Sequence, residues 1–479
     1  MRTHSFPALR SGRVAAAVVV IVAAAALGGC ATFAPDGGFG AIEQVARDRA
    51  NKEVRWARTH ADLDIIDQRV AELLARPLSA EDAVQIALLN NKGLQAAFFE
   101  LGIAEADVVQ AGRLPNPKFA MMRTSNGADL AIEQSITVNI LALLLLPQTL
   151  AIEQRRFDRS QRAIALETLT LASAARKAYY TAVAADETVR YMVQVRKAAD
   201  AGAELARRMA QVGNFTKLQQ AREQSFYADA MLNLARAEQA QRAAREKLTR
   251  LLGLWGPQTQ FRLPERLPDL PDTPTDLPDV ERTAIAQRLD VQMAKLETEA
   301  MARNLGLSRT TRFINALEFG PARVLEGQRG DPYKRGYEVS FELPIFDWGT
   351  AKVAKAEAIY MQSFNRAAET AVNARSEVRE AYQGYRSGFE IARHYRDEIV
   401  PLKKRIAEEN QLRYNGMLIG VFELLADARS QIASVNGYIE ALRDFWLAQA
   451  DLEMAMIGKP AMGRSSGATM TSAPGAAEH

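Results

Sequence analysis

The two halves of this chain repeat each other at a fixed offset. The run Arg176-Lys177-Ala178-Tyr179 returns as Arg379-Glu380-Ala381-Tyr382, 203 positions later, and Gly213 returns as Gly416 at the same offset. Two anchors in one register indicate one structural unit used twice, which constrains the fold more than any single motif. Both copies have the pattern of long helices, so the sequence predicts a tube or bundle and not a catalytic cleft.

The N-terminus predicts export. Arg2, Arg10 and Arg13 precede an unbroken apolar run, residues 14–27, which is too short to span a bilayer as a helix. The apolar run ends with the sequence Leu27-Gly28-Gly29-Cys30. This sequence resembles the lipobox of bacterial lipoproteins. On that resemblance the signal peptide is cleaved before Cys30, which carries the acyl chains. An ordinary secretory signal with an unrelated cysteine is the alternative.

Residues near the predicted lipid site also bear on location. By analogy with such lipoproteins, Ala31 in place of an aspartate favours the outer membrane. Cys30 is the only cysteine, so a disulfide framework is excluded despite the exported location. Multiple acyl chains would anchor the protein far better than one, because each buried methylene contributes roughly 0.8 kcal/mol.

Composition argues against nucleic-acid binding and enzymatic chemistry. The formal charge is only +3 over 479 residues, and this near balance argues against nucleic acid as a partner. The four histidines, His4, His60, His394 and His479, do not form a metal motif with the single cysteine, and neither the HExxH spacing nor a phosphate-loop pattern occurs in the sequence. We therefore expect no enzyme activity, no cofactor and no metal site.

The positions of proline-rich and other helix-breaking segments predict how the chain is organised. Five prolines within residues 264–278 forbid regular helix there and favour an extended connector between the two repeats. The predicted segments are the signal peptide (1–29), a lipidated linker with a polar helix over 41–75 (30–77), the first repeat (78–260), the connector (261–278), the second repeat (279–458) and a disordered tail (459–479).

Within each repeat we predict a helix, two strands, a long helix, a short break and a closing helix. Ser79 followed by Asp82 is a capping-box start for the first of these helices. Pro401 should kink or split the long helix of the second half. Apolar residues spaced alternately four and three apart predict left-handed coiled coils, at Tyr360, Phe364, Ala367, Ala371, Ala374, Val378, Ala381 and Tyr385, and again at Val421, Leu425, Ala428, Ile432, Val435, Ile439, Leu442 and Trp446.

Two segments alternate apolar and polar residues with a period of two, as strands with one apolar and one polar face do. They run from Leu130 to Ile140 and from Glu338 to Ile345, and Lys118–Thr124 and Arg312–Phe319 are the weaker candidates for their partners. Four strands cannot close a transmembrane barrel, and lipid does not tolerate open sheet edges. Strands that meet a bilayer would therefore require oligomerisation, whereas a small soluble hairpin packed on a helix is the alternative.

Four motifs in this order resemble TolC-like outer-membrane efflux proteins, over roughly residues 78–458. They are the opening helix with Leu78-Ser79-Ala80-Glu81-Asp82 and Asn90-Asn91, then Ala111-Gly112-Arg113-Leu114-Pro115-Asn116-Pro117, Leu343-Pro344-Ile345-Phe346-Asp347-Trp348-Gly349, and Arg413-Tyr414-Asn415-Gly416. The resemblance implies a mostly α fold with a small β part, forming a homotrimer with a 12-stranded outer-membrane barrel and a helical tunnel across the periplasm. It also implies docking to a periplasmic adaptor and an inner-membrane transporter, and its lipidated branch fits Cys30.

The chain departs from that family at two places. The first repeat has Leu146-Pro147-Gln148-Thr149 where the second has Phe346-Asp347-Trp348-Gly349, so we expect the two strand-to-helix corners to differ. Near the second tip the family often has two aspartates one helical turn apart, whereas this chain has Glu423 and Asp427, one position further from the glycine. These two share a helix face, and in a trimer they would place six carboxylates around the periplasmic mouth and favour cations. The alternative is an ordinary solvated face.

The two helix breaks are the second candidate site. Glycine permits the left-handed geometry of a tight turn, and apolar residues beside the turns would be exposed unless a partner covers them. The resemblance implies that the partner is the adaptor, and simple capping of the chain's own coiled coil is the alternative. The residues are Val212, Gly213, Asn214 and Phe215 in the first break, and Asn415, Gly416, Met417 and Leu418 in the second.

These features predict a passive outer-membrane channel of a tripartite efflux system, driven by its inner-membrane partner. Drugs, other toxic compounds and metal ions are all possible cargoes, because the sequence does not identify one. A channel for protein secretion is an alternative within the same class. A periplasmic coiled-coil scaffold lipoprotein without a pore is the alternative from another class, but it does not account for strands at corresponding places in both repeats.

Overall fold

The computed structural model describes residues 32–127, 129–313 and 316–459. The chain divides into two compact units. Unit 1 comprises Met1–Phe39, Phe99–Gln161 and Met293–Ala367, and unit 2 comprises Gly40–Phe98, Arg162–Gln292 and Ala368–His479. The predicted signal peptide, Cys30 and the tail from residue 460 lie outside the described residues.

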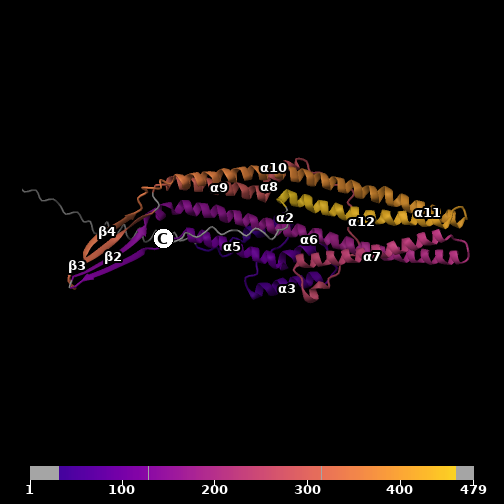
Figure 1. Cartoon of the computed structure of the whole chain (residues 1–479), viewed down its shortest axis with the longest axis horizontal. Helices are drawn as coiled ribbons and strands as arrows, with labels where there is room; N and C mark the ends of the chain where they lie inside the picture. Colours follow the sequence, from indigo (N-terminus) through magenta and orange to yellow (C-terminus); the bar gives the residue numbers. More distant parts are fainter. Residues whose placement is uncertain (1–31, 128, 314–315, 460–479) are drawn as a thin grey trace, which may run out of the picture. The chain divides into compact units, whose positions relative to one another are not determined.

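Both halves of the chain have the same order of elements, namely two short helices, two strands, a long helix, a turn and a closing helix (Figure 1). Helices α2 (Gly40–Ala50) and α3 (His60–Leu74) precede the first half. The first half contains α4 (Ala80–Asn90), α5 (Lys92–Ala111), β1 (Lys118–Asn126), β2 (Asp129–Asn139), α6 (Ile140–Gln211) and α7 (Lys217–Leu252). The second contains α8 (Val280–Gln287), α9 (Leu289–Thr310), β3 (Leu317–Gly327), β4 (Lys334–Phe341), α10 (Thr350–His394), α11 (Val400–Asn415) and α12 (Val421–Ile457).

Two helix predictions are wrong in their bounds. The polar helix predicted over residues 41–75 is broken between α2 and α3, because Asn51 has a left-handed φ of 50° and Thr59 starts α3 with a capping box to Asp62. The opening helix of each half is also two helices, with an extended residue, Asn91 or Arg288, at the joint. The capping box predicted at Ser79 is confirmed.

The side chain at each joint binds the end of the closing helix of its own half. Asn91 Nδ2 donates to the Leu251 carbonyl (3.0 Å) in the last turn of α7. Arg288 Nη1 donates to the Ala455 carbonyl (3.1 Å) in the last turn of α12. Both joints therefore satisfy carbonyls that a helix end leaves without an intrahelical partner.

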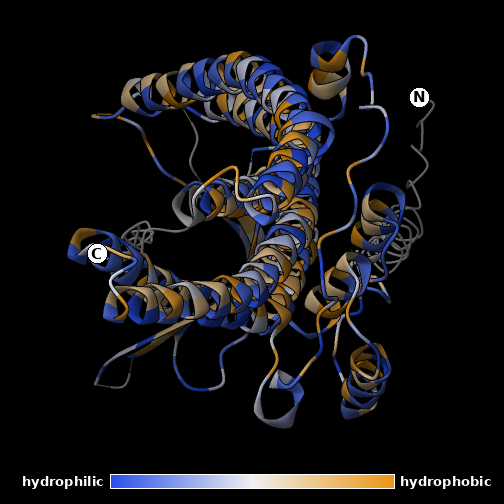
Figure 2. Cartoon of the chain, turned by 90° about the vertical axis from the view of Figure 1, so that its right-hand side faces the viewer, coloured by the Kyte–Doolittle hydropathy of each residue, from blue (hydrophilic) through white to orange (hydrophobic). Residues whose placement is uncertain are grey.

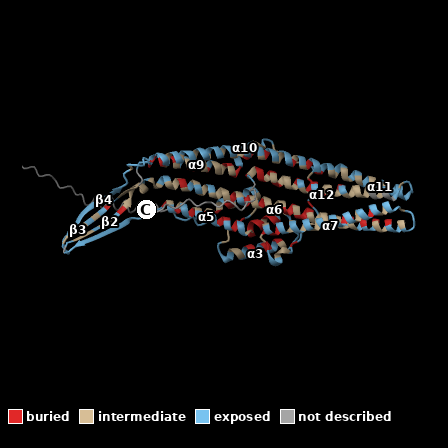
Figure 3. Cartoon of the chain, viewed as in Figure 1, coloured by how far each residue is buried: buried red, intermediate tan, exposed pale blue. Residues whose placement is uncertain are grey.

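Unit 1 contains a four-stranded antiparallel sheet in the order β1-β2-β3-β4. In its register Phe119 lies opposite Ile136, Ile132 opposite Leu325, and Arg323 opposite Arg335. Gly320 is required where β3 lies close against β2, because a Cβ there would lie 1.8 Å from the Ile136 carbonyl oxygen. The outer strands β1 and β4 are exposed throughout, whereas most residues of β2 and β3 are half-buried or buried (Figure 3).

Residues that share a face of this sheet follow from its register, because directly opposed residues point to the same side. One face, here called the apolar face, carries Phe119, Met121, Ile132, Ile136, Val138, Phe319, Leu325, Tyr337, Val339 and Phe341. The other, the polar face, carries all five strand carboxylates, of Asp129, Glu133, Glu318, Glu326 and Glu338. The predicted alternation of apolar and polar faces is confirmed.

The strand bounds differ from the prediction in the second half. The partner strand predicted over Arg312–Phe319 begins only at Leu317 and continues to Gly327. The strand predicted to reach Ile345 ends at Phe341, because Pro344 has no N–H for a ladder. Residues 342–349 instead form a loop that closes on Gly349, with a φ of 71°.

The two strand-to-helix corners differ, as predicted. In the first half β2 leads directly into α6, where Asn139 Oδ1 accepts from the Ala142 N–H (2.8 Å) and Pro147 lies inside the helix. In the second half Asp347 Oδ1 accepts from the Gly349 N–H (2.8 Å), and α10 begins one residue later. Ile140, predicted at the end of a strand, is therefore the first residue of a helix.

The four-and-three spacing is carried by α10 and α12, of which α12 and the part of α10 from Ala368 onward belong to unit 2. Hydrophobic and hydrophilic residues share each long helix, as Figure 2 shows. Along α10 and α12 the spaced positions include buried residues, at Ala374, Val378, Tyr385, Ile439 and Leu442. The predicted coiled-coil face is therefore packed there, but Phe364 on the same face of α10 is 52% exposed. Pro401 has the predicted effect, since a π-helical turn, Tyr395–Ile399, separates α10 from α11.

The connector predicted over residues 261–278 is extended and is held along the helices of unit 2. The Trp446 indole donates to the Pro268 carbonyl (3.1 Å), and the Thr275 N–H donates to the Tyr385 hydroxyl (2.9 Å). Leu267 and Leu270 are buried. Among the described helices, none combines the length and apolarity that a membrane span requires.

Candidate docking turns and acidic helix face

The first turn, residues 212–216, joins α6 to α7 in unit 2. The Asn214 N–H donates to the Met209 carbonyl (2.9 Å) and the Gly213 N–H donates to the Ala210 carbonyl (3.2 Å). Gly213 has a φ of 83°, so these bonds form a Schellman end to α6. The prediction that Gly213 supplies left-handed geometry is confirmed.

The second turn, residues 416–420, joins α11 to α12 with the same two bonds moved by one residue. The Leu418 N–H donates to the Arg413 carbonyl (2.9 Å) and the Met417 N–H donates to the Tyr414 carbonyl (3.0 Å). Met417 is the left-handed residue, with a φ of 60°, whereas Gly416 has a φ of −78°. The role predicted for Gly416 is therefore wrong. A non-glycine residue occupies the strained position, at a cost of roughly 1–2 kcal/mol.

Apolar side chains stand out from both turns. Met417 is 93% exposed, Leu418 77% and Val212 71%, while the polar residues Asn214 and Asn415 are also exposed. Phe215 differs from the others because it is half-buried. Exposed apolar side chains next to backbone strain are typical of a site that another molecule covers, and the identity of that molecule stays a prediction.

The acidic pair lies in the first two turns of α12, in two different environments. Glu423 is exposed, and Asp427 is half-buried. Asn410 Nδ2 on α11 donates to Asp427 Oδ2. The two carboxylates are four residues apart on one helix, as predicted, but only Glu423 faces solvent freely. Groups of acidic, histidine or cysteine side chains able to hold a metal ion do not occur in the described part of the chain.

One ion pair close to this face was missed by the sequence analysis. Arg429 on α12 pairs with Glu223 on α7, with an Nη2 to Oε2 distance of 2.7 Å. The Glu223 side chain is 2% exposed, and the Arg429 guanidinium also lies 4.2 Å from the centre of the Phe226 ring. The spacing along the chain gave no signal for this contact, because its two partners come from different halves.

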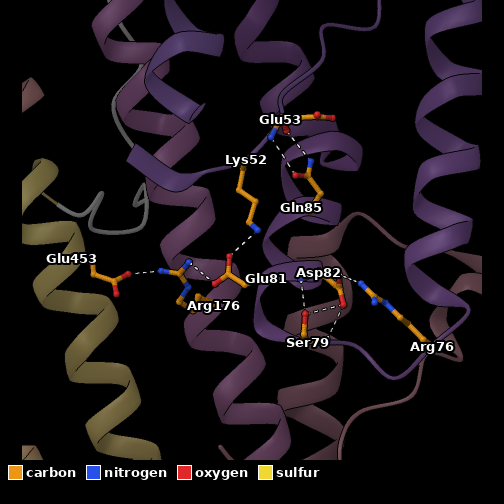
Figure 4. A network of polar contacts seen from close by, with 9 residues as sticks. All are labelled: Lys52, Glu53, Arg76, Ser79, Glu81, Asp82, Gln85, Arg176 and Glu453. Carbon is orange, nitrogen blue, oxygen red and sulfur yellow. Dashed lines mark hydrogen bonds and ion pairs between the residues drawn. The ribbon is translucent and has the colours of Figure 1, made fainter. Parts of the chain in front are cut away.

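The repeated Arg-x-Ala-Tyr run has a structural role in unit 2 that explains its return. Figure 4 shows the contacts of Arg176, the arginine of the first copy. Arg176 Nη2 lies 2.9 Å from Glu81 Oε1 in the first turn of α4, and its Nη1 pairs with Glu453 on α12. Lys52 Nζ also pairs with Glu81 (2.7 Å). In the second half Arg379 Nε lies 2.9 Å from Glu281 Oε1 in the first turn of α8.

The tyrosine of each run makes a matching contact. The Tyr179 hydroxyl donates to the Leu78 carbonyl (3.0 Å), and the Tyr382 hydroxyl donates to Asp276 Oδ1 (2.9 Å). Burial raises the pKa of Tyr179 to about 12, so its hydroxyl remains a donor across the physiological range. In both halves the run therefore fastens a long helix to the start of a short one.

Comparison with known proteins finds solved structures with a similar fold. No family model matches the chain. The structure of the Campylobacter jejuni CmeC outer membrane channel superposes with a TM-score of 0.68 at 17% identity, over 84% of this chain and 89% of that one. CusC, described with its transmembrane channel formation, superposes with a TM-score of 0.67 at 17% identity, over 79% of this chain and 92% of that one.

The chain has the TolC-like outer-membrane channel fold. In sequence it is 25% identical over 282 residues to the cobalt-zinc-cadmium resistance protein CzcC of Cupriavidus metallidurans. That match covers 57% of this chain and 64% of CzcC, so it spans somewhat less than two thirds of the relative's length. The resemblance predicted from the motifs is confirmed at the level of the TolC-like fold.

Proposed function

We propose that this chain is the outer-membrane channel of a tripartite efflux system, anchored by lipid at Cys30. Three copies assemble, each giving four strands to a 12-stranded barrel and its long helices to a periplasmic tunnel. Transport is passive, and an inner-membrane transporter supplies the energy through a periplasmic adaptor. The TolC-like fold supports this proposal, because CmeC, which shares the fold, is an outer membrane channel.

The open sheet of unit 1 carries the proposal. Within the described residues β1 and β4 each pair on one side only, and the sheet has one apolar and one polar face. An open edge is not tolerated in lipid, and the smallest membrane barrels have about eight strands. Twelve strands from three copies would close the sheet, with the apolar face toward lipid and the polar face toward the lumen.

The second turn and the acidic face lie next to each other in the chain, and both turns and this face fit the periplasmic end of the proposed transport path. Met417, Leu418 and Val212 would meet the hairpin of the adaptor, because their exposed apolar surface is left without cover in one copy. Glu423 and Asp427 would line the periplasmic mouth. Carboxylates repeated by the threefold axis would concentrate cations there.

Divalent metal ions are the cargo we favour among the candidates. The observation behind this choice is the match to CzcC, whose name assigns it to cobalt, zinc and cadmium resistance. An acidic mouth would also suit cations better than anionic drugs. Loss of resistance to these metals, without loss of drug resistance, in cells lacking the chain would support this choice. The reverse pattern would contradict it.

The test of the channel is single-channel conductance of the purified, lipidated protein in planar bilayers, together with its mass in detergent. We expect a trimer with small, cation-selective steps that enlarge in Glu423→Ala or Asp427→Ala. Stable monomers without conductance would contradict the proposal and leave the periplasmic scaffold lipoprotein as the better explanation. A trimer that passes polypeptides would favour secretion.

A further inference from the structure

Arginine occurs on one face of the sheet, whereas lysine and the acidic residues occur on the other. All three strand arginines, Arg123, Arg323 and Arg335, lie on the apolar face, and both strand lysines, Lys118 and Lys334, lie on the polar face. Since all five strand carboxylates are on the polar face, the apolar face carries three positive charges and no acidic residue. An apolar surface would be expected to exclude charge, so these three arginines require an explanation.

The lysines of the polar face are already neutralised, whereas the arginines are not. Lys118 pairs with Glu318, and Lys334 Nζ lies 2.8 Å from Glu326 Oε2. Among the described residues, the side chains of Arg123 and Arg335 have no ion-pair or hydrogen-bond partner, and only their backbones pair within the sheet. Arg323 has only neutral ones, Gln134 Oε1 at 2.6 Å and the Tyr333 ring at 5.0 Å.

Two of the three arginines, Arg323 and Arg335, line a hollow with an apolar wall, and Arg123 lies on the same face of the sheet. Its volume is about 480 Å³, and its lining includes Phe119, Gln134, Ile136, Arg323 and Arg335. Arg323 and Arg335 are directly opposed across β3 and β4, a like-charge pairing that is unfavourable unless an anion lies between or above the two. The hollow therefore combines two adjacent guanidinium groups with hydrocarbon surface.

Aromatic residues mark the level of these arginines on the sheet. Tyr333, Arg335 and Tyr337 alternate along one side of the chain into β4, and Tyr337 is 75% exposed. The next rows away from the hairpin turns are apolar and include Val138, Phe319 and Val339. Tyrosine next to a purely apolar band is typical of the membrane interface, where lipid headgroups lie.

We propose that this arginine hollow binds the headgroup phosphate of an anionic membrane lipid, with the lipid's acyl chains lying along the apolar rows. Guanidinium groups bind phosphate oxygens in a bidentate manner, which explains why arginine and not lysine occupies this face. The inference rests on the proposed function, because the sheet must be embedded in a bilayer. It adds a defined lipid site to that function.

The experiment is a titration of the full-length protein in neutral detergent with phosphatidylglycerol or with phosphatidylcholine of the same acyl chains, followed by native mass spectrometry. The test variant is R123Q/R323Q/R335Q. The matched control is K118Q/R329Q/K334Q, which removes three positive charges from the polar face and the turn of the same sheet. Each arginine near an anionic surface contributes roughly fivefold in affinity, so we expect the test variant to bind phosphatidylglycerol about 100-fold more weakly. The control and all phosphatidylcholine titrations should change by less than about threefold.

Three results would overturn the site. These are unchanged phosphatidylglycerol binding in the test variant, an equal loss in the control, or displacement of the lipid by inorganic phosphate at millimolar concentration. If the triple variant does not fold, the single variants should each lose about fivefold, and R123K/R323K/R335K should retain part of the binding. Lipid binding is measured without conduction, so a protein that binds lipid but passes no current would contradict the channel and leave the lipid site standing.

Discussion

Arg429 and Glu223 join α12 to α7 close to the two helix turns, through an Nη2 to Oε2 contact of 2.7 Å. The carboxylate is almost fully buried, and the guanidinium retains about a third of its exposure. Next to this pair, Ala230 and Val195 form an apolar cluster that Ile432 of α12 also contacts. The pair therefore connects the closing helices of the two halves where the proposed channel would have to open.

Replacing Arg429 by methionine should destabilise unit 2 by about 1–3 kcal/mol, because Glu223 would remain buried without a partner. The double variant E223Q/R429M should recover part of this loss, since it leaves no unpaired charge. Denaturant unfolding followed by circular dichroism measures both. Arg443→Met is the control, because Arg443 pairs only with its exposed neighbour Asp444, and it should cost less than about 1 kcal/mol. An R429M variant as stable as this control would show that the buried pair does not hold the helices.

Substituting the left-handed residue of each turn should change the stability of the protein, in opposite directions for the two turns. Met417→Gly should stabilise the protein by about 0.5–1 kcal/mol, because relief of left-handed strain exceeds the added entropy of the unfolded chain. Gly213→Ala should destabilise it by about 1 kcal/mol for the same reason. Thermal unfolding checks both changes.

Met417→Gly also separates stability from docking. It removes the most exposed apolar side chain of the second turn, so binding of a periplasmic adaptor should weaken while the melting temperature rises. Equal binding by the variant and the natural protein would remove Met417 from the proposed contact surface.

The elements and their order were predictable because local signals produce them. The alternation around Ile132, the four-and-three spacing around Val378 and the breaks near Gly213 and Gly416 all depend on residues close together in the chain. Strand bounds were less predictable, since the partner of a strand decides where pairing stops. Arg288 and Arg429 could not be found, because a buried arginine with partners far along the chain has the same local pattern as a surface arginine.

Arg288 illustrates how much a buried arginine of this kind contributes to the free energy of unfolding. Its side chain is 1% exposed and pairs with Asp290 (2.6 Å) and Glu377 (2.7 Å). Arg288→Met would leave two carboxylates without their cation, and should cost about 3–5 kcal/mol. Asn91→Ala, at the corresponding joint of the first half, should cost only about 1–2 kcal/mol, because it loses two neutral hydrogen bonds, from Nδ2 to the Leu251 carbonyl and from the Leu94 N–H to Oδ1. Urea unfolding of both variants tests the difference, and similar losses would contradict it.

The capping box of α4 should make stability depend on pH. Burial raises the pKa of Asp82, but hydrogen bonds from Ser79 and the ion pair with Arg76 more than offset this effect, so the pKa lies below its ordinary value of 3.8. A depressed folded pKa stabilises the protein above pH 3.8, and this contribution is lost as the pH falls through the folded pKa. Asp82→Asn should therefore be less stable than the natural protein at pH 6 by about 1 kcal/mol. This difference in stability between the variant and the natural protein should disappear below pH 3.8 in a series of thermal unfolding measurements. A difference that persists at low pH would show that the charge of Asp82 is not its cause.

The two carboxylates of the acidic face should contribute unequally to ion selectivity. Glu423 is exposed, whereas Asp427 accepts a hydrogen bond from Asn410, which fixes its orientation and occupies one oxygen. If the face lines the mouth of a trimer, Glu423→Gln should reduce the cation-to-anion permeability ratio by at least about twofold, and Asp427→Asn should reduce it less.

Reversal potentials across a potassium chloride gradient measure this ratio for each variant. Glu408→Gln is the matched control, since Glu408 lies on the neighbouring α11 and makes only a distant contact with Lys404, at 3.9 Å. We expect this control to leave the reversal potential unchanged. If it shifts the potential as much as Glu423→Gln does, the effect is one of general surface charge, and the acidic pair is an ordinary solvated helix face. Asn410→Ala provides a second check, because it frees Asp427 and should raise the cation preference only if that carboxylate faces the transport path.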